Sequence, residues 1–247
     1  MIKEKLIYGI HALSEALDSG VELDKLYIKK GTLVPELSAI KKQAQELGIP
    51  VLTVPPERLN RFTRASHQGV VALVSPIQYV NLEWLIPQLY EQNQDAPFIV
   101  VLDGITDVRN FGAIARTCEC AGVHAIVIPD RESVSVTADA VNASAGALLR
   151  VPVCRVSSLY AACRYLQHCG LQLVGASEKA SQTYTQAPLR RPLALVMGAE
   201  DKGISASIAK ILDQAVAIPM KGKIASLNVS VACGILLYQI LQQEPSE

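Results

Sequence analysis

Three loops combine small residues with a few polar side chains at places where strongly apolar runs end. An apolar strand that leads into a polar loop and then a helix is where open α/β sheets bind ligands. Polar side chains there could orient a ligand through hydrogen bonds, and glycines leave backbone N–H and C=O groups accessible to it. The pattern therefore predicts a binding site assembled from strand ends. The three loops are residues 102–123, 197–205 and 218–232.

The first two loops each supply a candidate side chain, and each candidate has a plainer interpretation. Asn110 is a suitable N-cap for the helix expected after it, and Gly112 lets another backbone approach closely. Arg116 follows about 9 Å further along the helix axis and interrupts a largely apolar segment, unless it simply extends to the surface. Glu200 lies in the turn after Gly198, where an ordinary surface carboxylate is the alternative.

The third loop places Ser226 and Asn228 on either side of Leu227, at the start of a helix that is almost wholly apolar. Both polar residues could be simple helix caps. Their position beside a loop that is rich in glycine and lysine makes a binding site the more specific interpretation.

The composition excludes several classes of protein. Half of the 247 residues are hydrophobic and 19% are charged, which argues against a disordered or fibrous chain. No apolar run reaches the roughly 18–20 residues of a membrane span, and the N-terminus lacks a signal-peptide pattern, so we expect a cytoplasmic protein without membrane contact. The six cysteines form no CxxC pair and the four histidines are scattered, which predicts reduced structural thiols and no metal site. A nucleotide-binding oxidoreductase is unsupported because neither GxGxxG nor GxxxxGK[ST] is present.

The elements that must position the three loops alternate between strands and helices. Near-continuous Val/Ile/Leu strands separated by helices indicate an α/β fold with a parallel sheet covered on both faces. Physical reasoning alone predicts an open, doubly wound sheet, because threaded chains are rare. The predicted strands are 24–31, 50–55, 69–76, 98–104, 124–129, 151–156, 171–177, 193–198 and 214–219; the predicted helices are 7–18, 34–48, 57–64, 110–122, 137–149, 158–170, 205–212 and 226–243.

The chain divides into a small N-terminal domain, residues 1–80, a linker, 81–96, and a second domain, 97–247, with the run QNQDAP as the boundary. The linker is expected to begin as a helix and to continue as a polar stretch. The net charge is zero, which argues against bulk electrostatic binding of nucleic acid. Residues 1–80 nevertheless hold ten Lys/Arg against eight Asp/Glu, and a local patch suffices to contact phosphates. The two local clusters are Lys25/Lys29/Lys30 and Arg58/Arg61/Arg64.

The three loops resemble the three motifs of the SpoU (TrmH) family of RNA ribose 2′-O-methyltransferases, within the SPOUT class. The matching runs are N-F-G-A-I-A-R-T with the following A-G-V, M-G-A-E-x-x-G, and the very specific I-P-M-x-G-x-x-x-S-L-N-V-S-V-A. The only departures are Phe111, where the family often has Leu, and two variable positions. The runs Y-G-I-H-A-L-x-E-A-L (8–17) and S-H-Q-G-V-V-A (66–72) resemble the ribosomal-protein-type substrate-binding domain of the RlmB-like branch. That branch methylates a guanosine ribose in the peptidyl-transferase region of 23S rRNA.

The resemblance implies a small N-terminal α/β RNA-binding domain and a C-terminal α/β trefoil knot in place of the open sheet. It also implies a homodimer with the last helix in the interface. S-adenosylmethionine would be the methyl donor, with no metal. A neutral adenosine that lies against apolar strands needs little charge, which suits the near-neutral second domain. The cofactor contacts implied are Met197, Gly198, Ala199, Ile218, Met220, Ser226 and Leu227.

The reaction implied is in-line attack of a ribose 2′-hydroxyl on the methyl group of a sulfonium. Catalysis then consists of orienting the hydroxyl and helping its proton to leave. Arg116 is the residue usually assigned as base, but a guanidinium with a pKa above about 12 is a poor base. We therefore interpret Arg116 as a clamp on the target phosphate that stabilises developing alkoxide charge, with Glu200 orienting the ribose or Arg116. The catalytic residues implied by the family are Asn110, Arg116, Glu200, Ser226 and Asn228.

Two alternatives remain open at the level of sequence. The same chemistry could act on tRNA or on another rRNA position, because the motifs fix the reaction and not the nucleotide. A non-catalytic RNA-binding or assembly factor could keep the fold, although the retention of every motif residue argues against it.

Overall fold

The computed structural model describes residues 5–92, 96–131, 133–224 and 226–244. The chain folds into two compact units. The first consists of Met1–Gln78 with Ser135–Asp139, and the second of Tyr79–Val134 with Ala140–Glu247.

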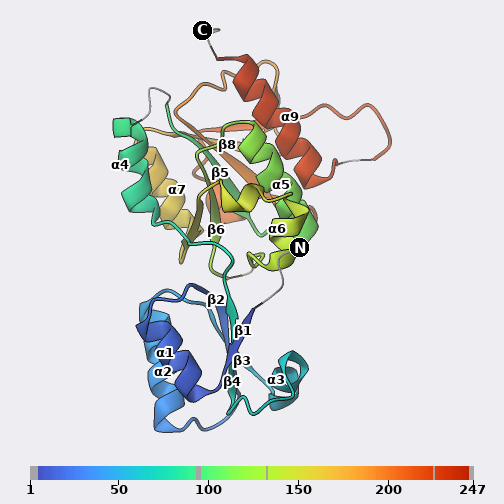
Figure 1. Ribbon diagram of the computed structural model, residues 1–247. Helices are drawn as coiled ribbons and strands as arrows, with labels where there is room; N and C mark the ends of the chain where they lie inside the picture. The colour runs from blue at the N-terminus through green and yellow to red at the C-terminus, as the bar shows by residue number, and fades with distance from the viewer. Residues whose placement is uncertain (1–4, 93–95, 132, 225, 245–247) are drawn as a thin grey trace. The chain divides into compact units, whose positions relative to one another are not determined.

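The first unit is built on a four-stranded sheet with the strand order β1-β4-β2-β3. Strand β3 runs parallel to β2, whereas β4 is antiparallel to both β2 and β1. Helices α1 and α2 lie on one side of this sheet and α3 lies on the other (Figure 1). The elements are β1 (Leu6–Tyr8), α1 (Ile10–Asp18), β2 (Leu23–Lys29), α2 (Pro35–Glu46), β3 (Val51–Val54), α3 (Pro56–Phe62) and β4 (Val70–Val74).

Alternation along β2 explains why the sheet has two small cores. Leu26 and Ile28 point toward α1 and α2, where Leu37 is fully buried beside them. Tyr27, between them in sequence, points to the opposite face and packs with Leu59 of α3. Each helix layer therefore has its own apolar cluster.

The helix predicted over residues 7–18 is wrong in its first turn. Leu6–Tyr8 forms an edge strand that pairs with Leu73–Val71 of β4, and α1 begins only at Ile10. Gly9, with φ of +87°, separates the two elements, because a residue in the positive-φ region cannot continue a right-handed helix.

The second unit is a seven-stranded, entirely parallel sheet with the order β7-β6-β5-β10-β8-β11-β9. Helices α4 and α7 cover one face, and α5 and α9 lie on the other (Figure 1). The elements are α4 (Leu82–Gln92), β5 (Phe98–Asp103), α5 (Val108–Cys120), β6 (Ala125–Pro129), α6 (Ala138–Ala143), η1 (Ala147–Leu149), β7 (Val153–Val156), α7 (Leu159–His168), β8 (Gln172–Ala176), β9 (Gln182–Thr183), β10 (Leu193–Gly198), α8 (Ala206–Ala209), β11 (Gln214–Ala217) and α9 (Val229–Gln242).

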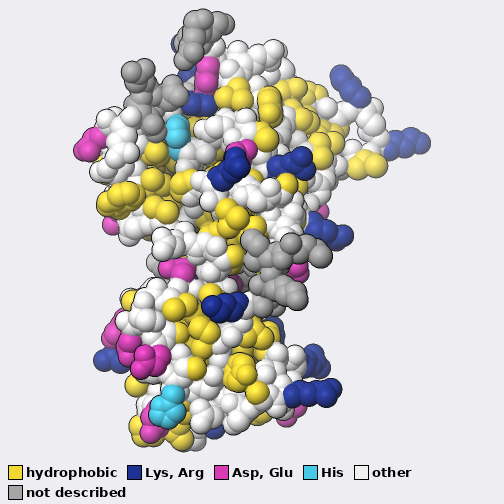
Figure 2. Space-filling model, in the orientation of Figure 1, with side chains coloured by type: hydrophobic (Ala, Val, Ile, Leu, Met, Phe, Trp, Pro, Cys, Tyr) yellow, Lys and Arg dark blue, Asp and Glu magenta, His cyan; other side chains and the backbone are white. Residues whose placement is uncertain are grey.

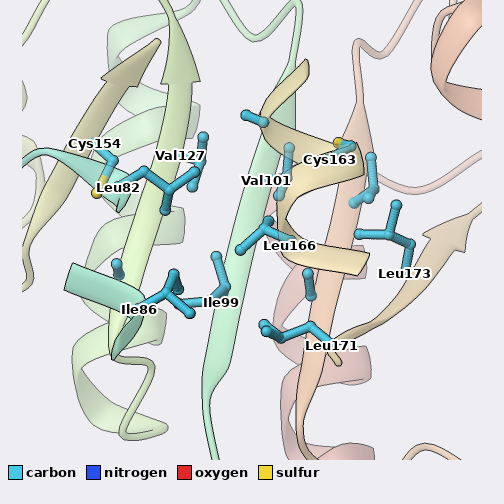
Figure 3. Close-up of a cluster of buried hydrophobic side chains, with 14 of the residues drawn as sticks. Leu82, Ile86, Ile99, Val101, Val127, Cys154, Cys163, Leu166, Leu171 and Leu173 are labelled. Atoms are coloured by element: carbon cyan, nitrogen blue, oxygen red, sulfur yellow. The ribbon is translucent and has the colours of Figure 1, made fainter. Parts of the chain in front are cut away.

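One face of this sheet forms a continuous apolar core with α4 and α7 (Figure 3). Ile99 and Val101 of β5 meet Leu166 of α7 there, and Ile86 of α4 packs into the same cluster. The segment 81–96 therefore contributes a helix to the core of the second unit. Residues 93–95 of the proposed boundary QNQDAP lie outside the described residues.

Two predicted helices of the second unit are shorter than expected. The helix predicted over 137–149 breaks after Ala143, because Ala145 and Gly146 both have positive φ, and a short 3₁₀ turn follows. The helix predicted over 205–212 is only α8, four residues long. Strand β9, two residues at the sheet edge, was not predicted because it is too short to show alternation.

The α/β class and the parallel sheet covered on both faces are confirmed. The trefoil knot stays a prediction from the family resemblance. Within the described ranges, every helix is too short or too polar to cross a lipid bilayer.

Candidate active site

A cavity of about 430 Å³ opens where β8, β10 and β11 end. These strands are neighbours in the sheet, with β8 in the middle. Because all three run parallel, their carboxyl ends meet on one edge, where ligands bind in open α/β sheets. The cavity is within the size range of small-molecule sites, about 300–1,000 Å³.

All seven predicted cofactor contacts line this cavity. The end of β10 supplies three of them, the segment after β11 supplies two, and the loop before α9 supplies the last two. Apolar side chains such as Val216 and Leu212 form much of the remaining wall. The seven residues are Met197, Gly198, Ala199, Ile218, Met220, Ser226 and Leu227.

The turn after β10 is closed too tightly for a side chain at Gly198. The backbone N–H of Gly203 donates to the carbonyl of Ala199 at 2.7 Å, which folds the chain back on itself. A Cβ at Gly198 would lie 2.1 Å from the carbonyl carbon of Gly203 and 2.2 Å from the nitrogen of Ile204. The glycine is therefore required by a close approach of two backbone segments at the cavity wall.

A hydrogen-bond network joins three of the predicted catalytic residues at the edge of the cavity. Oε1 of Glu200 accepts from Nδ2 of Asn228 at 2.7 Å, from Nδ2 of Asn110 at 3.1 Å and from the backbone N–H of Val229 at 3.2 Å. Nδ2 of Asn228 also donates to Oδ1 of Asn110 at 2.8 Å. The amides of Asn110 and Asn228, which come from distant parts of the chain, thus meet on one carboxylate oxygen of Glu200.

The side-chain oxygen of Asn228 is also hydrogen-bonded, which fixes the orientation of the amide. Its Oδ1 accepts from the backbone N–H of Ser230 at 3.0 Å and from the Ser230 hydroxyl. Asn228 is therefore the N-cap of α9 and a member of the polar network at once. The cap interpretation of Asn228 is confirmed, and its role in a site stays a prediction.

The expectation that Asn110 caps α5 is wrong. The cap is Asp107, whose Oδ1 accepts from the backbone N–H groups of Arg109 at 2.8 Å and Asn110 at 2.9 Å. The hydrogen bond from the Asn110 N–H contributes most, and both bonds lower the pKa of Asp107 because they stabilise the carboxylate. Asn110 lies in the first turn of the helix, which leaves its amide free to reach Glu200.

Arg116 is not brought to this network. Its side chain is exposed on α5, and it is absent from the cavity wall. A displacement of six positions turns a residue by about 240° around a helix, so Asn110 and Arg116 cannot share a face. Ser226 lines the cavity but makes no hydrogen bond with the network among the described residues.

None of the six cysteines is among the residues that line the cavity. All six are free thiols, and Cys154 and Cys163 have their pKa raised to about 12 by burial, so both stay protonated near neutral pH. Among the described residues no cluster of three or more His, Cys, Asp or Glu side chains could hold a metal ion. The expectation of structural thiols is consistent with this arrangement.

Sequence reasoning missed the part of the wall that β8 supplies, Ala176 to Lys179. The sequence does contain the signal, an apolar run that ends in the polar residues after Ala176. What it does not contain is the strand order that inserts β8 between β10 and β11.

The fold and site define a ligand-binding α/β enzyme domain that follows a smaller α/β unit. Residues 97–238 match the model of the SpoU rRNA Methylase family. Residues 6–80 match the RNA 2′-O ribose methyltransferase substrate binding model. The chain belongs to the SpoU family of RNA methyltransferases.

Similar proteins span nearly the whole chain. YacO of Bacillus subtilis, assigned to the TrmH family of tRNA/rRNA methyltransferases, is 35% identical over 96% of this chain and 95% of its own. A Staphylococcus haemolyticus protein with the same assignment is 34% identical over 98% and 97%.

Solved structures agree with the fold. An rRNA methyltransferase of Sinorhizobium meliloti with S-adenosylmethionine bound is 25% identical, covers 99% of this chain and 89% of its own, and has a TM-score of 0.63. AviRb of Streptomyces viridochromogenes, a SpoU methyltransferase also in complex with S-adenosylmethionine, is 22% identical over 97% of this chain and 90% of its own. Its TM-score is 0.62, a likeness of fold.

Proposed function

We propose that this chain transfers a methyl group from S-adenosylmethionine to a ribose 2′-hydroxyl of RNA, with a guanosine of 23S rRNA as the target. The observation that carries the proposal is the cavity at the ends of β8, β10 and β11. All seven predicted cofactor contacts line it, and a polar network lies at its edge. Its apolar wall and the backbone of Met197–Ala199 suit a neutral adenosine.

S-adenosylmethionine, when bound, supplies an electrophilic methyl group on a sulfonium, so the protein's task is to place the hydroxyl. Glu200 holds Asn110 and Asn228 through one carboxylate oxygen, Oε1. Its Oε2 has no hydrogen-bond partner in the described part of the chain, and we assign it to the ribose. Arg116 binds the target phosphate and stabilises the developing alkoxide, for which a guanidinium is better suited than for accepting a proton.

Asn110→Ala is expected to lower kcat on substrate RNA by about 10- to 100-fold, the usual scale for loss of a positioning group. The affinity for S-adenosylmethionine should stay the same, because Asn110 does not line the cavity. Steady-state kinetics with labelled cofactor, together with calorimetric titration of the cofactor, separate the two quantities. Unchanged kinetics on RNA would remove Asn110 from the site.

The chain is proposed to act as a homodimer through α9. Val231 and Tyr238 are about half exposed on this helix, and Ile235 lies between them at helical spacing, so the three form one apolar stripe. Figure 2 shows hydrophobic side chains gathered over α9. An exposed stripe of this kind is typical of a protein interface. In such a dimer, Arg116 of one protomer would serve the cavity of its partner, which would account for its absence from the cavity of its own chain.

One experiment tests the function and its target together. The protein is incubated with labelled S-adenosylmethionine and, separately, with unmodified rRNA and tRNA, and the methylated ribose is then mapped. Labelling of one 23S rRNA guanosine is the expected result. Labelling of tRNA or of another rRNA position would contradict the proposed target and support the proposed reaction. Binding of RNA without any transfer would favour a non-catalytic assembly factor.

A further inference from the structure

The two faces of the sheet in the first unit differ in charge. Helices α1 and α2, on one face, together carry four carboxylates and two lysines. Helix α3 and the two residues after it, on the other face, carry Arg58, Arg61 and Arg64 against the single carboxylate Glu57. The Lys29 side chain lies on the same face as these arginines. Its neighbour in β2, Ile28, is buried under α1 and α2, and successive strand residues point to opposite faces. The positive charge is thus concentrated on the α3 face.

The same face carries an exposed aromatic side chain. Tyr8 of β1 and Tyr27 of β2 both pair with Val71 of the strand between them, so the two rings project to one side of the sheet. Tyr27 is buried against Phe62, with ring centroids 4.7 Å apart, and the Arg58 guanidinium lies 5.7 Å from the Tyr27 ring centre. Tyr8, on the edge strand, remains 39% exposed.

The basic face is held in shape by the loop that precedes β4. The backbone N–H of Gly69 donates to Nδ1 of His67 at 3.0 Å, so Nε2 of His67 carries the proton toward Oδ1 of Asn60 in α3, 2.9 Å away. The Lys29 side chain lies across Gly69, where a Cβ would come within 2.7 Å of the lysine Cδ. The loop therefore fixes both α3 and the path of Lys29, and a preorganised surface loses less entropy on binding.

We propose that the α3 face binds a single, unpaired strand of the substrate RNA. Arg58, Arg61, Arg64 and Lys29 contact its phosphates, and one unstacked base lies on Tyr8. Unpaired RNA is the form that offers both a phosphate backbone and a free base for an aromatic ring. The inference rests on the proposed function for the identity of the partner. It goes beyond that proposal in assigning RNA contact to one face and excluding the α1/α2 face.

The test uses the full chain and a 20-nucleotide single-stranded RNA, a 20-base-pair RNA duplex and a 23S rRNA transcript as probes. The variant Arg58→Gln/Arg61→Gln/Arg64→Gln is expected to bind the strand and the transcript at least about 10-fold more weakly. The slope of log affinity against log salt should fall by about 2 units, since each phosphate contact on single strands contributes about 0.7. The matched control is Lys41→Gln/Lys42→Gln on α2, which should leave both quantities unchanged.

Tyr8→Ala is expected to weaken binding of the single strand by about 5- to 100-fold, the usual range for one base stacked on an aromatic ring. Tyr8→Phe should keep wild-type affinity. Thermal unfolding checks that each variant is folded. If the triple variant is not, Arg61→Gln and Arg64→Gln are tested singly, since both side chains are exposed.

The outcomes are distinguishable from failure of the proposed function. Wild-type RNA affinity in the triple variant, or an equal loss of affinity in the α2 control, would contradict the assignment of RNA binding to the α3 face. An equal loss of duplex and strand binding in Tyr8→Ala would overturn base stacking. A wild-type protein that binds RNA through this face but transfers no methyl group would contradict the proposed function and support the face.

Discussion

Replacing Gly198 by alanine is expected to abolish measurable binding of S-adenosylmethionine and to destabilise the second unit. The added Cβ would lie 2.1 Å from the Gly203 carbonyl carbon. This neighbour is a backbone atom, so no side-chain rotation can relieve the overlap. The free energy of unfolding should fall by the upper part of the usual overpacking range, about 3 kcal/mol. The turn would have to open, which displaces Ala199 and Glu200 at the cavity wall. Calorimetric titration of the cofactor and urea unfolding measure the two effects.

The matched control is Gly222→Ala, in the loop between β11 and α9. A Cβ at Gly222 meets no atom within 4 Å, so the substitution should leave stability and cofactor affinity close to wild type. Cofactor binding by Gly198→Ala at the level of this control would contradict the assignment of the cavity.

Arg116→Lys is expected to lower kcat by about 100-fold, the scale for loss of one preorganised group that stabilises transition-state charge. Lysine keeps the positive charge but loses the planar fork that binds a phosphate in a bidentate manner. The affinity for S-adenosylmethionine should not change, because Arg116 is not part of the cavity wall. Arg109→Lys, on the same helix and exposed, is the control and should keep wild-type kcat. Near-normal turnover by Arg116→Lys would rule out the phosphate clamp.

Mixed dimers show which protomer supplies Arg116. Arg116→Lys and Glu200→Gln proteins, each expected to be strongly impaired alone, are unfolded and refolded together. If Arg116 acts in the partner's site, random pairing of protomers should restore about a quarter of the wild-type sites. No recovery in a mixture of confirmed dimers would place Arg116 in the site of its own chain. A light-scattering mass near the 26.6 kDa of one chain would contradict the dimer itself.

The sequence predicted most of the parallel sheet because its strands are long apolar runs and its helices are periodic. It also predicted the close approach at Gly112, where a Cβ would lie 2.5 Å from the Ala143 Cβ. The failures occurred where local signals compete. Asp107 and Asn110 are both good capping residues three positions apart. In the structure Asp107 accepts the backbone N–H bonds of the cap, whereas the Asn110 amide bonds to Glu200, 90 positions away.

The candidate site was predictable as a set of residues and not as an arrangement. The second and third motif runs contain all seven predicted cofactor contacts, because they begin where β10 and β11 end, on the same edge of the sheet. The spacing of six positions along one helix already indicates that Arg116 and Asn110 lie on different faces. The expectation that the two residues share a site came from the family resemblance. The β8 contribution, from Ala176 onward, depended on strand order, which is set by packing among elements distant in sequence.

The carboxylate of Glu200 has a consequence for how the protein matures. Hydrogen bonds join Asn228 to Glu200, Asn110 to Glu200 and Asn228 to Asn110, which are 28, 90 and 118 residues apart in sequence. Contacts over such separations form slowly and late, after local helices and strands. A ribosome that has not yet released α9 holds a chain in which Glu200 and Asn110 lack their third partner. The network around Glu200 can therefore close only after Asn228 and α9 have been synthesised.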